Sequence, residues 1–71
     1  MNANKLKAQM ALHGENASTL AEAIGITAPR FSQKINERGA EFNKREIMLI
    51  KERYNLTPEE LDAIFFDELV S

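Results

Sequence analysis

Residues 16–36 read NASTLAEAIGITAPRFSQKIN, and this stretch decides the fold. Its first part predicts a short helix, because Leu20 and Ile24 recur at helical spacing after Asn16, a residue type that favours helix N-termini. Gly25 ends this helix, since glycine adopts the left-handed backbone conformation without strain. We therefore expect a helix over about residues 17–24 and a sharp change of chain direction immediately after it.

The second part of the stretch predicts another helix with a narrow apolar face. Phe31 and Ile35 form an apolar pair four residues apart, and the other side chains are mostly polar. The N-cap is Thr27 or Ala28, because Pro29 suits a first helical turn but restricts the residue before it. Two short helices joined by a tight turn are the spacing of a helix-turn-helix unit.

Outside this stretch, the same periodicity predicts three more helices and no strand. The first covers about residues 4–13 and ends at Gly14. Capping boxes beginning at Asn43 and Thr57 open the other two, which extend to about Tyr54 and to about Phe66 or Glu68. The fold class is therefore an all-α protein of five helices. The expected core comprises Leu6, Met10, Leu20, Ala21, Ile24, Phe31, Ile35, Ile47, Ile50, Tyr54, Leu56, Leu61, Ile64 and Phe65.

Length and composition indicate one small globular domain over residues 1–71. The chain has 44% hydrophobic and 28% charged residues and no cysteine, so a compact apolar core must stabilise it without disulfides. Its net charge of −2 is unevenly divided: residues 1–45 carry seven cations and four anions (net +3), and residues 46–71 carry two cations and seven anions (net −5). A basic half attracts polyanions even on an acidic protein, because the local potential governs binding.

Several segments, taken in order, carry a family resemblance. They are Leu20-Ala21, Ile24-Gly25-Ile26-Thr27, Phe31-Ser32-Gln33-Lys34-Ile35-Asn36, Asn55-Leu56-Thr57-Pro58-Glu59-Glu60-Leu61 and Phe65-Phe66. In these segments the chain resembles the phage repressor and lambda Cro-like helix-turn-helix family, in particular small regulators of phages of Gram-positive bacteria. The resemblance covers nearly the whole chain, and it implies a lambda-repressor-like five-helix domain.

The same resemblance implies that the protein regulates transcription, within a phage lysis–lysogeny switch, by placing a recognition helix of about residues 28–36 in the major groove of operator DNA. A homodimer would read a near-palindromic operator. Gln33 would pair with adenine, Arg30 with guanine or a phosphate, and Ala28 and Pro29 would touch a thymine methyl group. The residues expected to read bases are Ala28, Pro29, Arg30, Gln33 and Lys34, and those expected to hold phosphates are Asn16, Thr27, Asn36, Lys44 and Arg45.

A second hypothesis keeps the fold but replaces the DNA with a protein. This hypothesis is an antirepressor that binds a partner phage repressor. Three features favour it: the net negative charge, the absence of hydrogen-bond donors in the side chains of Ala28 and Pro29, and apolar residues left outside the core. An antitoxin of the same fold is a third, weaker alternative. The candidate protein interface comprises Met48, Leu49, Phe66, Leu69 and Val70.

Composition also indicates which functions to exclude. The chain has one histidine, His13, no cysteine and no glycine-rich phosphate loop, so we expect no metal site, no catalytic residue and no cofactor. No apolar run is long enough to span a bilayer, and the first residues lack the apolar stretch of a signal peptide. We therefore expect a cytoplasmic protein with no membrane partner, and the resemblance implies that this cytoplasm is that of a bacterial host.

Overall fold

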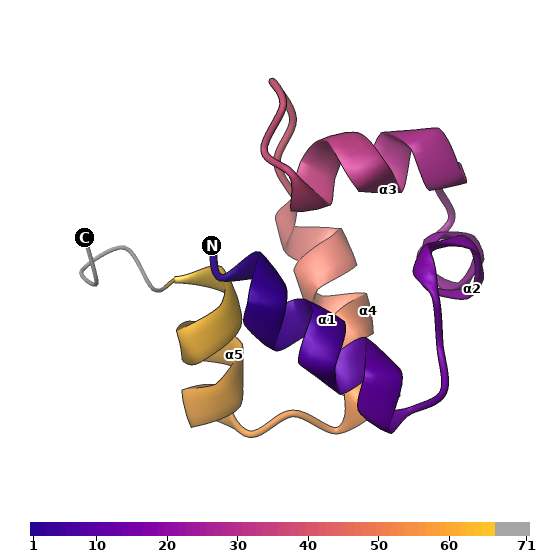
Figure 1. Ribbon diagram of the computed structural model, residues 1–71. Coiled ribbons are helices and arrows are strands. Elements are labelled where there is room, and N and C mark those ends of the chain that lie inside the picture. Colours follow the sequence, from indigo (N-terminus) through magenta and orange to yellow (C-terminus); the bar gives the residue numbers. More distant parts are fainter. Residues whose placement is uncertain (67–71) are drawn as a thin grey trace.

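Five α-helices make up the computed structural model, which describes residues 1–66 (Figure 1). No strand occurs within these residues, so the all-α prediction is confirmed for them. The helices begin and end within two residues of the positions predicted, except that the predicted extension of the last helix to Glu68 lies outside the described residues. They are α1 (Ala3–Leu12), α2 (Ala17–Ala23), α3 (Ala28–Ile35), α4 (Lys44–Tyr54) and α5 (Pro58–Phe65).

Each helix begins with a polar side chain that caps free backbone amides. The Thr27 hydroxyl accepts a hydrogen bond from the amide of Arg30 at 3.2 Å, so Thr27 rather than Ala28 is the N-cap of α3. The predicted capping boxes at Asn43 and Thr57 are both present. Asn2 caps α1, so this helix begins one residue earlier than predicted. Short polar residues therefore fix where the helices start.

The core is a single cluster to which all five helices contribute. All fourteen predicted core residues belong to it: twelve are buried, and Ile47 and Leu61 are half-buried and pack against its edge. Phe42, in the segment between α3 and α4, joins the cluster and meets Phe31 and Phe65 edge to face. Phe42 therefore ties the loop after α3 to the body of the molecule.

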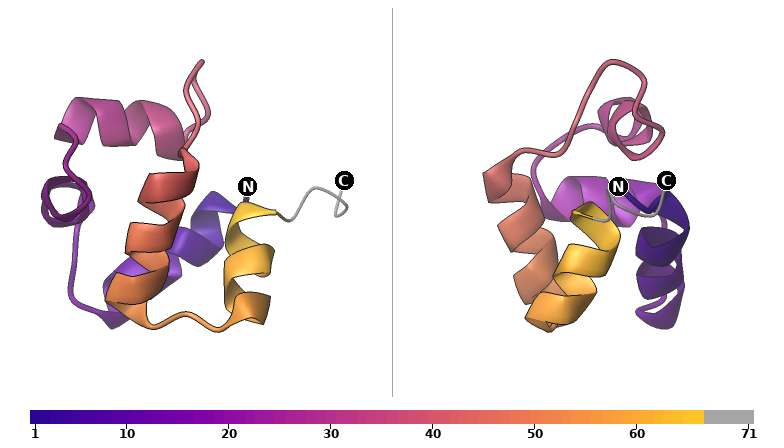
Figure 2. Two further views of the ribbon diagram at one scale, coloured as in Figure 1. Left: turned by 180° about the vertical axis from the view of Figure 1, so that it is seen from behind. Right: turned by 90° about the vertical axis from the view of Figure 1, so that its left-hand side faces the viewer.

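In Figure 1, α1, α4 and α5 form the body of the molecule, and α3 lies across its upper end. Helix α1 packs against α5, and α2 packs against α3. Figure 1 shows α3 lying lengthwise across one end of the molecule, with α2 seen end-on beside it. Both views of Figure 2 show α3 at the same end, beyond α1, α4 and α5, with the loop after it projecting further. One long side of α3 is consequently turned away from the body.

The turn between α2 and α3 depends on glycine at one position. Gly25 has φ +80°, and its amide donates to the carbonyl of Glu22, while the amide of Ile26 donates to the carbonyl of Ala21. A β-carbon at Gly25 would lie 3.3 Å from Nη2 of Arg45, so a side chain there adds crowding to backbone strain. Glycine therefore allows α3 to start immediately after α2.

A polar cluster lies where the end of α1, the start of α2 and the end of α4 meet. The Arg53 guanidinium donates two hydrogen bonds to the Glu15 carboxylate, and the His13 ring stacks on Tyr54 with centroids 4.4 Å apart. The hydrogen bonds from Arg53 lower the pKa of Glu15 from 4.5 to about 2, against the effect of desolvation. Burial raises the pKa of Tyr54, and the neighbouring Glu15 charge adds to this effect.

This cluster predicts how acid destabilises the protein. Because the folded-state pKa of Glu15 lies below its ordinary value, its contribution to stability is present above about pH 4.5 and is lost as the pH falls towards 2. Urea unfolding should show that Glu15→Gln is less stable than the parent protein at pH 7, and that the difference shrinks across this pH range. The exposed Glu22→Gln serves as a control and should show no such convergence. A pH-independent difference at position 15 would contradict the ion-pair explanation.

Candidate nucleic-acid interface

Helix α3 has one buried face and one exposed face. Phe31 and Ile35 are buried in the core, whereas Pro29, Arg30 and Gln33 are exposed. At about 100° per residue, Pro29 and Gln33 lie about 160° from Phe31, on the side of the helix opposite the core. These three side chains are therefore accessible, as base-reading residues must be, whereas Ala28, in the first turn, is half-buried.

The two long polar side chains on the exposed face are joined to each other. Nη1 of Arg30 donates a hydrogen bond to Oε1 of Gln33 at 3.1 Å. Residues three apart on a helix are neighbours, so this contact needs no distortion of the backbone. The result is a small polar unit on the outer side of α3, which we call the Arg30–Gln33 pair.

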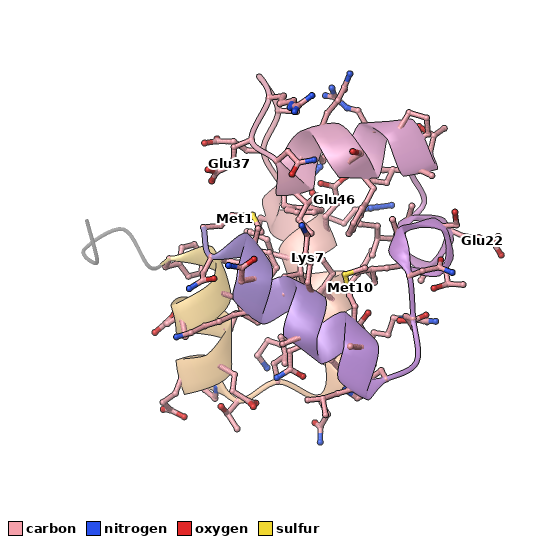
Figure 3. The ribbon with its side chains drawn as sticks, viewed as in Figure 1. Met1, Lys7, Met10, Glu22, Glu37 and Glu46 are labelled. Atoms are coloured by element: carbon pink, nitrogen blue, oxygen red, sulfur yellow. The ribbon has the colours of Figure 1, made fainter. Side chains whose placement is uncertain are left out.

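Lys34 is not part of this exposed face, and its predicted outward orientation is wrong. Its side chain points inward and is buried, with the residue 6% exposed. Its ammonium group donates to both oxygens of Glu46, which is 2% exposed, at 2.6 and 2.7 Å. Figure 3 shows Glu46 beneath α3, between that helix and the rest of the molecule. Lys34 is therefore committed to a buried ion pair and does not reach a base.

The Lys34–Glu46 ion pair joins the end of α3 to the start of α4. Glu46 also accepts a hydrogen bond from the amide of Asn43, so one carboxylate serves both the ion pair and the capping box of α4. Burial alone raises the pKa of a carboxyl group, but the hydrogen bonds from Lys34 and Asn43 outweigh it, and the pKa of Glu46 lies below its ordinary value. This ion pair fixes how α3 sits on the body.

Three of the predicted phosphate-binding residues have structural roles. Asn16 and Thr27 are the N-caps of α2 and α3, and each accepts a hydrogen bond from a backbone amide. The side-chain amide of Asn36 donates to the carbonyl of Ser32, one turn back. All three residues are exposed, but these hydrogen bonds already explain their presence.

The remaining two predicted phosphate-binding residues open α4. Lys44 and Arg45 are exposed in the first turn of that helix. The Arg45 guanidinium donates to the carbonyl of Ile24, at the end of α2, at 3.3 and 3.4 Å. Arg45 thus links the turn between α2 and α3 to the start of α4, and it brings a positive charge to that turn.

The predicted protein interface is only partly in view. Phe66 is 54% exposed and Met48 is 42% exposed, as expected for residues outside the core, whereas Leu49 is half-buried and packs against the core. Leu69 and Val70 lie outside the described residues. Leu12, at the end of α1, is also exposed, which the sequence reasoning missed.

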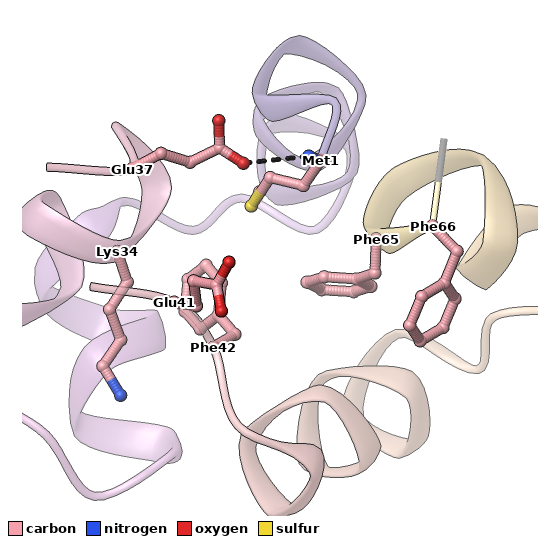
Figure 4. A pocket seen from close by; sticks show the side chains of 7 residues that line it. All are labelled: Met1, Lys34, Glu37, Glu41, Phe42, Phe65 and Phe66. Atoms are coloured by element: carbon pink, nitrogen blue, oxygen red, sulfur yellow. Dashed lines mark hydrogen bonds and ion pairs between the residues drawn. The ribbon is translucent and has the colours of Figure 1, made fainter. Parts of the chain in front are cut away.

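A groove lies beside Phe66, with a volume of about 390 Å³. Figure 4 shows Phe42, Phe65 and Phe66 along it, with Met1 nearby, where the amino group of Met1 pairs with Glu37 at 2.9 Å. Glu41 also lines it, so aromatic rings and carboxylates share this surface. The groove is distinct from the exposed face of α3.

Glu46 has a role that the sequence analysis did not predict: besides its part in the capping box of α4, it pairs with Lys34. Lys34 lies about 60° from Phe31 around α3, so helical geometry already places it at the edge of the buried face. A lysine buried in that position needs an anion to compensate its charge, and Glu46, the capping residue of the next helix, provides that anion. A lysine beside the apolar face of one helix and a glutamate in the first turn of the next therefore indicate such an ion pair from the sequence.

Comparison with known proteins adds no relative: no family model, curated protein or solved structure matches this chain. In the part of the chain that the structure describes, no three acidic, histidine or cysteine side chains gather as metal ligands would. Within the same residues, no helix combines the length and apolarity needed to cross a bilayer.

Proposed function

We propose that this protein is a sequence-specific DNA-binding regulator of transcription that inserts α3 into the major groove. The observation that carries the proposal is the two-faced character of α3. Phe31, Ile35 and the buried Lys34 hold its inner side, while Arg30 and Gln33 stand exposed on the outer side. A rigidly held helix with an exposed polar face has the size and chemistry that the major groove accepts.

Elements around α3 supply the contacts that would hold the DNA backbone. In this proposal α2, the turn at Gly25 and α3 act as a helix-turn-helix unit. Lys44 and Arg45 would bind phosphates at the start of α4, because cations there do not favour the helix itself but combine with its amides to attract anions. Phosphate contacts of this kind set the position of the protein on the duplex and leave sequence discrimination to α3.

The biological setting follows from the sequence resemblance to phage repressors and Cro-like regulators. Two copies would place their α3 helices in successive major grooves, roughly 34 Å apart, on a near-palindromic operator. Such a protein would act in the bacterial cytoplasm, within a phage lysis–lysogeny switch.

Fluorescence anisotropy tests the proposal directly. The purified chain is titrated into a duplex from the region flanking its gene and into a scrambled duplex of equal length, over a series of salt concentrations. We expect tighter binding to the flanking duplex by about a thousandfold, with affinity that falls steeply as salt rises. Equal, weak binding to the two duplexes would contradict the proposal.

A second candidate function is favoured by the exposed Phe66 and the aromatic groove beside it. Here the protein would act as an antirepressor that binds a partner repressor through this surface. Co-purification with a repressor encoded nearby, lost in Phe66→Ser but retained in Gln33→Ala, would support this function. Failure to bind or shift any such repressor would exclude it.

A further inference from the structure

We infer that the Arg30–Gln33 pair selects guanine, and rejects adenine, at the base pair it faces. This inference rests on the proposed DNA-binding function and specifies the base class that α3 reads. Considered by itself, Gln33 predicts a contact with adenine. The inference differs because the Gln33 side chain is hydrogen-bonded to Arg30.

The pair presents mostly hydrogen-bond donors. A glutamine that reads adenine uses its oxygen to accept from the N6 amino group and its nitrogen to donate to N7. Here Oε1 of Gln33 already accepts from Nη1 of Arg30 at 3.1 Å. This bond engages one of the two lone pairs of that oxygen and turns it towards the guanidinium, which carries donors only, so the pair offers more donors than acceptors.

Guanine matches this arrangement and adenine does not. In the major groove guanine offers two acceptors, O6 and N7, whereas adenine offers N7 beside an N6 amino donor. Adenine would therefore set its amino group against the donors of the pair and leave buried donors without partners. The hydrogen bond to Gln33 also holds the guanidinium in place before binding, which reduces the ordering cost.

The other side chains near the outer face of α3 are not available to discriminate between guanine and adenine. Ala28 and Pro29 have no polar side-chain atom, and Lys34 is buried against Glu46. Ser32 is exposed, but its hydroxyl lies 3.4 Å from the Asn36 amide nitrogen, which donates to it. Arg30 and Gln33 are therefore the long polar side chains available on the outer face of α3.

Selection from a pool of random duplexes, followed by affinity measurements, tests the inference with the full chain. Each strongly enriched guanine is replaced in turn by adenine, with its partner base changed to match, and by 7-deazaguanine, which lacks the N7 acceptor. At one position per half-site, both changes should weaken binding of the parent protein about tenfold or more. In Arg30→Ala the same changes should have little effect there, and adenine should become the preferred base because Oε1 of Gln33 is released.

Lys44→Ala is the matched control, since it removes one charge outside α3. It should weaken binding to all duplexes alike and keep the guanine preference. Adenine enriched by the parent protein at this position, or a guanine preference that survives in Arg30→Ala, would overturn the base assignment while leaving DNA binding intact. A pool in which no sequence is enriched would overturn the proposed function, and the base assignment with it.

Discussion

Replacing Lys34 by methionine is expected to lower the free energy of unfolding by about 3 kcal/mol, because it leaves a buried carboxylate without its countercharge. Methionine keeps most of the length of the lysine side chain, so little packing is lost. Glu46, however, is 2% exposed and has no other cation at hydrogen-bond distance among the described residues. Urea unfolding followed by circular dichroism at pH 7 measures the loss.

A second variant separates charge from packing. Glu46→Gln in the Lys34→Met background removes the buried charge but keeps an oxygen that can accept from the Asn43 amide, as the capping box requires. This double variant should recover most of the lost stability. A loss below about 1 kcal/mol in Lys34→Met, or no recovery in the double variant, would contradict the role given to the ion pair.

Removing the Arg30–Gln33 pair is expected to have the largest effect on DNA binding. Arg30→Ala combined with Gln33→Ala should weaken binding to the operator by roughly a hundredfold or more, towards the affinity for a scrambled duplex. Both side chains are exposed and alanine favours helices, so the fold and its stability should be almost unchanged. Anisotropy titrations against both duplexes measure the loss of specificity.

Lys7, on α1, has an exposed side chain, and Lys7→Ala gives a charge-matched control. It removes one positive charge, as the double variant does, but it should leave discrimination between operator and scrambled DNA intact. If the double variant kept the full discrimination of the parent protein, α3 would not be the element that reads the sequence.

Local signals in the sequence were sufficient to predict the helices. Asn16, Thr27, Asn43 and Thr57 cap helices where their side chains and the residues after them indicated, since capping depends only on neighbours in the chain. The apolar periodicity likewise identified the core-facing side of α3, including Phe31. These features involve separations of three or four residues, over which sequence and structure are closely coupled.

Contacts between helices were harder to predict. The resemblance placed Lys34 among the base-reading residues, but in the structure the start of α4 brings Glu46 within hydrogen-bond distance of its ammonium group. Phe42 is absent from the predicted core, yet its ring lies between Phe31 and Phe65. Both depend on how elements meet in space, which periodicity along one helix does not specify.

The most direct test of the central proposal is an NMR titration of the isotope-labelled chain with the operator duplex. We expect the largest amide shifts at residues 27–33, with further shifts around Lys44 and Arg45, and little change in α5. Shifts concentrated around Phe66 and the aromatic groove, with α3 unaffected, would contradict DNA recognition by α3.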